Sequence, residues 1–285
     1  MYAAISRSEE PIPPQRLQRL NGGIRVSFSG RANRLTELYQ ANPCRVLLPR
    51  RPKGQVEAVL LNTAGGITDG DQLDYTIAAH DGACVTATTQ AAEKVYRSRG
   101  GDSHVHSHLN ITGGGFLEWL PQESILFNGG ALARKTDIEI SGDSRLLALD
   151  WLVLGRLASG ETLDRAAVHD RWRLRRDGVL IWADDFRLAG DLEALRHRPS
   201  LLDGARALAT LIYVANDAPD HLEAVREMLS ASISRAGVSE RPGLLICRFL
   251  GPDGFVLRRD VEKFLLSFRT ILHGRPYPLP RVWAC

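Results

Sequence analysis

Short runs of alternating apolar and polar residues, separated by turns rich in Gly and Asp, fill most of the first two thirds of the chain. In the first run, Ile24, Val26 and Phe28 alternate with polar neighbours. Similar runs recur at 45–48, 56–61, 73–78, 84–89, 104–111, 116–120 and 136–140. Because successive side chains of a β-strand point to opposite faces, this period of two predicts strands. Many short strands at near-regular spacing predict a mainly β fold, either a β-sandwich or a stacked (helical) β-coil.

A two-residue turn defines one hairpin within this pattern. Asp177-Gly178 separates the runs 172–176 and 179–183, and this dipeptide is typical of a type I′ turn. Such a turn sets the register of the two strands that it joins. The predicted cross-strand pairs are Arg176 with Val179, Leu174 with Ile181, and Arg173 with Trp182.

Spacing typical of helices appears only after the strand-rich region. The apolar run 207–215 predicts a buried strand. Asp217 can then cap a helix that continues through Ala236, and Gly237 can end that helix. The apolar residues that would share one face of this helix are Leu222, Val225, Met228, Leu229 and Ile233.

A second strand and a second helix follow. The strand is predicted over 244–250, and the helix over 260–273, with Gly274 as its end. The last third of the chain is therefore predicted to have a β-α-β-α order. The whole chain is expected to be a mainly β scaffold with two α-helices in the C-terminal third.

Length and composition favour one large domain. The chain has 285 residues, of which 44% are hydrophobic and 24% are charged, so it can bury a sizeable core. We expect a flexible N-terminal arm, 1–22, and an extended, Pro-rich C-terminal tail, 275–285. Between them we expect a single β-rich domain, 23–274, whose β-α-β-α part covers about 205–274.

Neither a membrane nor nucleic acid is an expected partner. No apolar run approaches the roughly 18 residues that a spanning helix needs, and residues 1–15 carry Pro and Glu where a signal peptide would need an apolar block. The net charge of +3 is mild, and the Arg residues are interspersed with acids. Scattered cysteines without a short spacing indicate reduced thiols and a cytoplasmic location. They are Cys44, Cys84, Cys247 and Cys285.

Three histidines alternate in the predicted strand over 104–111. His104, His106 and His108 would point to the same face, about 7 Å apart, which is too far for all three to bind one tetrahedral ion. Two of them with a carboxylate from an adjacent strand could bind one. Tracts of this kind attract Ni²⁺ and Zn²⁺. The alternative is a solvated strand face with adventitious or no metal binding.

Acids in apolar or glycine-rich surroundings are further candidates for a metal site. Glu118 and Glu123 flank a corner at Pro121 among large apolar residues, where carboxylates are either kept wet or held for binding. We expect these two carboxylates to be solvated. Asp69 and Asp71 lie in a glycine-rich turn that lacks the Lys and helix of a phosphate loop. We expect two solvated carboxylates there, which could attract a cation.

Five motifs follow one another along the chain. They are LNTAGGITDGD at 61–71, TTQAAEKVYR at 88–97, EWLPQE at 118–123, LGR at 154–156 with SGE at 159–161, and LPRVW at 279–283. In this order they resemble the UreD (also called UreH) family of urease accessory proteins. The resemblance covers nearly the whole chain beyond the N-terminal arm.

The resemblance implies a non-catalytic, β-rich scaffold with two helices. It implies that such a protein binds the urease apoprotein on one side and UreF, which carries the UreG GTPase, on the other. It further implies that transient Ni²⁺ reaches the urease active site through an internal passage, with no tightly bound cofactor.

Carboxylates suit such a passage because they can hold a divalent ion weakly enough to release it. At matching positions, the candidate nickel path is Asp69, Asp71, Glu118, Glu123, Glu161 and Asp184. The candidates for partner contact or a structural role are Gln90, Lys94, Tyr96, Arg97, Arg156, Arg281 and Trp283.

Two other classes of function stay open. A β-fold metal-dependent enzyme could use the His104, His106 and His108 face, but it would also need an open metal position and a tuned acid or base. A β-sandwich adhesion or structural protein would be expected to carry export signals or disulfides. The His segment is variable within the UreD family, so the resemblance assigns it no role.

Overall fold

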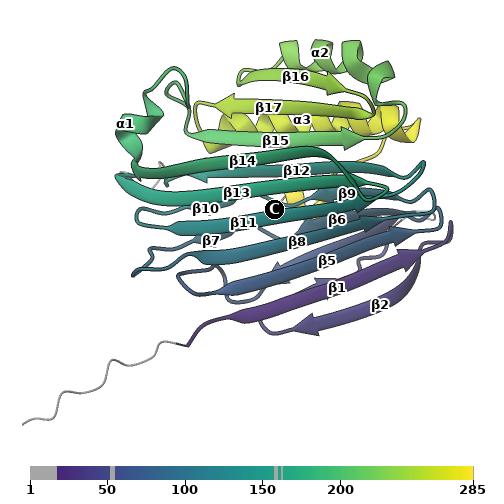
Figure 1. The fold of residues 1–285 in the computed structure, drawn as a ribbon, viewed down its shortest axis with the longest axis horizontal. Coiled ribbons are helices and arrows are strands. Elements are labelled where there is room, and N and C mark those ends of the chain that lie inside the picture. Colours follow the sequence, from purple (N-terminus) through teal and green to yellow (C-terminus); the bar gives the residue numbers. More distant parts are fainter. Residues whose placement is uncertain (1–17, 52–54, 157–159, 162, 285) are drawn as a thin grey trace, which may run out of the picture.

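Two stacked β-sheets make up most of the structure, a computed structural model that describes residues 18–51, 55–156, 160, 161 and 163–284 (Figure 1). The seven-stranded outer sheet has the order β14 (Val179–Asp191), β13 (Arg165–Arg176), β11 (Ala131–Ile140), β8 (Ser103–Ile111), β5 (Gln72–His80), β1 (Asn21–Ser29) and β2 (Arg34–Ala41). The central sheet has the order β16 (Arg235–Arg241), β17 (Leu244–Gly251), β15 (Ala207–Val214), β12 (Arg145–Leu154), β9 (Phe116–Leu120), β6 (Cys84–Thr89), β4 (Val56–Asn62) and β3 (Cys44–Leu47). Two short strands, β7 (Glu93–Val95) and β10 (Ser124–Leu126), pair with each other beside β12.

From β4 to β13 the chain passes back and forth between the sheets. Each return places a new strand parallel to the strand laid down one winding earlier, as β8 lies beside β5 and β9 beside β6. Parallel neighbours need a long crossover connection, and here the other sheet supplies it. The mainly β prediction is confirmed, and the winding is that of the stacked β-coil.

Side-chain alternation divides the interior into two apolar layers. One face of the central sheet, with Leu117, Trp119 and Leu146, packs against the inner face of the outer sheet. The opposite face, with Leu147 and Trp151, packs against α2 and α3. Because β12 is buried on both faces, its sequence is a nearly continuous apolar run.

The helical region differs from the prediction in one respect. A 3₁₀ helix, η2 (Ala218–His221), leads into α2 (Leu222–Ser230), and the chain then forms β16 instead of continuing as a helix to Ala236. Ala236 and Val238 of β16 pack against the apolar layer under the helices, and β16 pairs with the edge of β17. These tertiary contacts override the helical spacing, so the order is β-α-β-β-α.

The second predicted helix is present and begins earlier than expected. Asp253 caps α3 (Gly254–His273) by accepting a hydrogen bond from the Val256 amide, and Gly274 ends it with a φ of 64°. A five-residue helix, α1 (Leu192–Arg196), was not predicted. The tail is not wholly extended, because η3 (Arg281–Ala284) forms a short 3₁₀ turn. None of the helices in the described residues is both long and apolar enough to cross a membrane.

The hairpin between β13 and β14 is present with a shifted register. Asp177 and Gly178 both have positive φ, and Arg176 pairs with Val179 as predicted. The other two predicted pairs are wrong. A bulge follows, so Leu174 lies opposite Trp182 and Arg173 opposite Ala183. The bulge adds one residue to β14, which brings the Trp182 side chain to the buried face of the hairpin.

Candidate functional site

An arginine lies between two aspartates in the space between the two sheets. Arg134 projects inward from β11, Asp150 from β12 and Asp170 from β13. The Arg134 guanidinium is 2.5 Å from an Asp150 oxygen and 2.8 Å from an Asp170 oxygen. It also donates a hydrogen bond of 3.1 Å to the Ser124 hydroxyl. Inward parity on three strands from two sheets therefore brings three charges together inside the protein, and we call them the intersheet cluster.

The intersheet cluster is incompletely paired. Two carboxylates share one guanidinium, and burial raises the pKa of Asp150 even though Arg134 opposes the rise. Within the described residues, Arg134 Nε and Asp170 Oδ1 have no hydrogen-bond partner. Buried polar atoms without a protein partner usually meet water or a ligand. The cluster can therefore accept a further polar or charged species.

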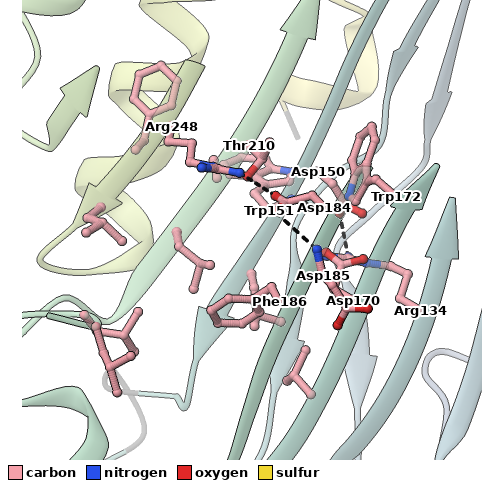
Figure 2. A pocket seen from close by; sticks show the side chains of 18 residues that line it. Arg134, Asp150, Trp151, Asp170, Trp172, Asp184, Asp185, Phe186, Thr210 and Arg248 are labelled. Carbon is pink, nitrogen blue, oxygen red and sulfur yellow. Dashed lines mark hydrogen bonds and ion pairs between the residues drawn. The ribbon is translucent and has the colours of Figure 1, made fainter. Parts of the chain in front are cut away.

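A cavity of about 340 Å³ leads from the intersheet cluster toward the surface. It is lined by β12, β13, β14, β15 and β17. Figure 2 shows Arg248 and Asp184 facing each other on one side and Arg134 with Asp170 on the other. The Arg248–Asp184 ion pair measures 2.7 Å, and Arg248 is more than half exposed. An entering ion would therefore meet Asp184 before the cluster.

A smaller cavity of about 50 Å³ continues on the far side of the cluster. It shares Arg134 and Asp150 with the first cavity, and Glu93, Gln122 and Ser124 also line it. Burial raises the pKa of Glu93 to about 7, although a hydrogen bond of 3.1 Å from Asn62 opposes the rise. Polar groups thus follow one another between the sheets, and we call the two cavities with these groups the intersheet site.

Glu118 lies in a different layer. It projects from β9 toward α3, where Arg269 holds it at 2.8 and 2.7 Å, His273 at 3.1 Å and Thr86 at 2.5 Å. Burial opposes ionisation, but Arg269 outweighs it and lowers the pKa of Glu118 to about 2. The expectation of a wet Glu118 is therefore wrong. Its partner Arg269 lies 151 residues away, so the local sequence gave no sign of it.

The other predicted acids are held by separate partners. Asp71 was expected to be solvated but is only 3% exposed, because its carboxylate accepts hydrogen bonds from the amides of Leu20 and Thr68. Asp69 pairs with Arg19 at 2.9 Å. Of the six predicted path residues, Asp184 alone lines either of the two intersheet cavities.

Two predicted acids lie in surface or partly buried ion pairs. Glu123 pairs with Arg258 at 2.8 Å, beside the C-terminal turn. Glu161 pairs with Arg156 at 3.2 Å and also accepts a hydrogen bond from the Asn128 amide. Both carboxylates thus hold neighbouring segments in place.

The predicted contact residues divide into exposed and buried groups. Gln90, Lys94, Tyr96 and Arg97 are exposed, and β7 runs through this segment. Trp283 is buried, stacks on Trp151 at 5.6 Å between ring centroids, and donates a hydrogen bond to Thr88. Its role in this structure is to anchor the C-terminal segment. The neighbouring Arg281 is exposed.

The remaining sequence candidates are histidines and cysteines. His104, His106 and His108 share the solvent face of β8, as their alternation predicted. Cys44, Cys84 and Cys247 are free thiols, the first and last of them buried. Cys285 lies outside the described residues.

Arg134, Asp150 and Asp170 were not predicted from the sequence, and Glu93 was placed only within the motif at 88–97. One signal was available for Asp150, which is the only charged residue in the apolar run 146–154. Its parity matches that of Ala148 and Leu152, both of which face the outer sheet.

Comparisons with known proteins agree on one family. The family model described as UreD urease accessory protein matches residues 20–284. A urease accessory protein UreD from Xanthobacter autotrophicus is 46% identical over 94% of this chain and 91% of its own length. Its counterpart from Magnetococcus marinus is 40% identical over 99% of both chains, and one from Brucella suis is 38% identical over 94% of this chain and 95% of its own.

Proposed function

This chain belongs to the UreD family of urease accessory proteins, and from that premise we propose that it is a non-catalytic scaffold that passes nickel to urease. Family membership gives the chain a role in urease maturation. The relatives are named as accessory proteins, not as enzymes. In the proposed role the scaffold binds the urease apoprotein and UreF, and meets the UreG GTPase through UreF.

The intersheet site is the observation that carries the proposal. A delivery path must hold a divalent ion weakly enough to release it, and carboxylates and waters do so better than soft ligands. Each acid of the larger cavity already has a basic neighbour. Asp184 has Arg248, the two cluster acids have Arg134, and Asp185 has His169 and Arg173. A passing Ni²⁺ must compete with these cations, which makes every binding step reversible.

The proposed path therefore keeps Asp184 and adds residues from the structure. It runs from Asp184 through Asp170 and Asp150 toward Glu93. We propose a structural role for the remaining predicted acids, because none of them lines either intersheet cavity and each holds an arginine or backbone amides in place. They are Asp69, Asp71, Glu118, Glu123 and Glu161.

Nickel content of urease tests the proposed path. Urease and its other accessory proteins are co-expressed with the parent chain, with Asp150→Asn, with Glu240→Gln, or without this chain. We expect Asp150→Asn to lower nickel per urease active site several-fold, because the carboxamide keeps a hydrogen-bond acceptor for Arg134 but loses the negative charge. Glu240 is exposed on the edge strand β16, so its variant controls for the loss of one acid.

A pull-down with urease and UreF separates transport from binding. Asp150→Asn should be captured as well as the parent. Full nickel loading of urease with Asp150→Asn would rule out the intersheet path. If the parent chain captured neither urease nor UreF, the scaffold role would be ruled out.

A further inference from the structure

Two imidazoles and a carboxylate converge on the outer surface of the molecule, away from the intersheet site. His106 and His108 lie on β8, and Asp137 lies on the adjacent strand β11. One ligand atom from each residue lies within 4.8 Å of those of the other two. His106 Nε2 is 2.8 Å from an Asp137 oxygen, and the two imidazole centroids are 3.7 Å apart. This is the arrangement of two histidines and one neighbouring carboxylate that the strand pattern suggested.

The strand register explains why these side chains meet. In the parallel pairing of β8 with β11, Asp137 lies opposite His108, and Lys135 lies opposite His106. These four side chains point outward, whereas Arg134, which lies on β11 between Ala133 and Lys135, points inward to the intersheet cluster. The β-sheet backbone lies between the two sites, so the surface cluster is independent of the proposed nickel path.

From this geometry we propose that His106, His108 and Asp137 form a surface site for a divalent transition-metal ion of the Zn²⁺ and Ni²⁺ class. Two imidazoles and one carboxylate are a ligand set that such ions favour. Metal–ligand bonds of about 2.0–2.1 Å separate the ligand atoms of a tetrahedral site by roughly 3.3 Å. Small side-chain rotations bring the three atoms to that spacing without moving the strands.

The surroundings supply further features of a metal site. Asp74 on β5 lies 3.8 Å from His106 Nδ1, on the ring edge opposite Asp137. A carboxylate that accepts a hydrogen bond from the second ring nitrogen orients a ligating histidine and raises its basicity, and Asp74 must approach His106 by roughly 1 Å to do so. A surface depression of about 280 Å³, lined by Asp74, His104 and His106, leaves room beside His106 for water ligands.

Lys135 pairs with the carboxylate of the cluster. Its ammonium is 2.5 Å from the same Asp137 oxygen that His106 contacts, and its side chain is 40% exposed. A metal ion must displace this ammonium, which can swing into solvent. Lys135 therefore weakens the affinity of the site and makes metal release easier.

Calorimetric titration of the purified full chain with ZnCl₂, and separately with NiCl₂, tests the site. We expect the double variant His106→Ala/His108→Ala to lose one bound ion per chain. We expect Asp137→Asn to lower the affinity for that ion about tenfold or more. Lys135→Met should bind it several-fold more tightly. His104→Ala is the matched control, since His104 shares the strand face but lies outside the cluster.

The imidazole NMR signals of His106 and His108 should shift together at one equivalent of Zn²⁺. The proposal is overturned if the double His variant keeps the parent stoichiometry, or if Lys135→Met binds no more tightly than the parent. These two imidazole signals report on the surface site alone, because Arg134 and its acids lie on the other face of the sheet. The surface site and the intersheet path can therefore fail separately.

Discussion

Two buried clusters each pair an arginine with carboxylates, Arg269 with Glu118 and Arg134 with Asp150 and Asp170, and they differ in how completely they are paired. Between the central sheet and α3, Glu118 has hydrogen-bond partners on both oxygens, and Arg269 uses its remaining donor on the Pro278 carbonyl. Between the sheets, Arg134 and Asp170 each keep an atom that has no hydrogen-bond partner in the described part of the chain, next to a cavity. The pKa shifts agree, because the Glu118 pKa is lowered to about 2 whereas that of Asp150 is raised. Complete pairing indicates a structural element, and incomplete pairing beside a cavity indicates a site.

Removing the arginine of the complete cluster should have the largest effect. Arg269→Met leaves Glu118 buried without its main partner, and breaking a buried ion pair in this way costs about 3–5 kcal/mol. Urea unfolding measures the loss in the free energy of unfolding. Arg235→Met is the control, because its pair with Asp203 is largely exposed and should contribute less than about 1 kcal/mol. Equal losses in the two variants would show that the Glu118 cluster is not structural.

The second largest effect should come from acid, which should destabilise the Glu118–Arg269 cluster. The folded-state pKa of Glu118, about 2, lies below its ordinary value of 4.5, so the ionised form is the one that folding favours. Its contribution, roughly 3 kcal/mol, is present above pH 4.5 and is lost as the pH falls toward 2. Unfolding free energies of the parent and Glu118→Gln, measured across this range, should converge on acidification. Parallel curves would contradict the assignment.

The incomplete cluster should respond with the opposite sign and a smaller effect. Burial raises the pKa of Asp150 in the folded protein. The contribution of this carboxyl to the free energy of unfolding is therefore fully present below its pKa in the unfolded chain and is lost as the pH rises through its pKa in the folded protein. We expect Asp150→Asn to change the unfolding free energy by no more than about 1 kcal/mol at neutral pH. Its stability relative to the parent should rise as the pH rises. A relative fall would show that Asp150 is held as an ordinary ionised partner of Arg134.

Local pattern was enough to predict many of the strands, though not β2, β12 or β16, and most of the helix α3, which begins at Gly254 where Asp260 was predicted. Alternation fixes which side chains share a face, so the common face of His104, His106 and His108 followed directly from spacing. The same reasoning failed after Ser230, where helical spacing predicted a helix to Ala236. Instead a turn at 231–234 leads into β16, which pairs with β17. Spacing describes one segment at a time, whereas the partner strand decides which of two compatible structures forms.

The sites could be predicted only in part, because their members come from distant strands. Arg134, Asp150 and Asp170 meet through the pairing of β11 with β13 and the packing of one sheet on the other. No local pattern specifies that packing. The surface cluster was closer to prediction, since only the neighbour of β8 was unknown. The carboxylate that joins the histidines is Asp137 of β11.

The back-and-forth path of the chain between the sheets has a kinetic consequence. Each parallel pair, such as β5 with β8 or β6 with β9, joins strands that are separated along the chain by a strand of the opposite sheet. Closing such long loops costs entropy before any contact repays it, so folds dominated by distant pairings form slowly. Half-wound intermediates expose open strand edges, and these are the species on which general folding assistance and aggregation compete.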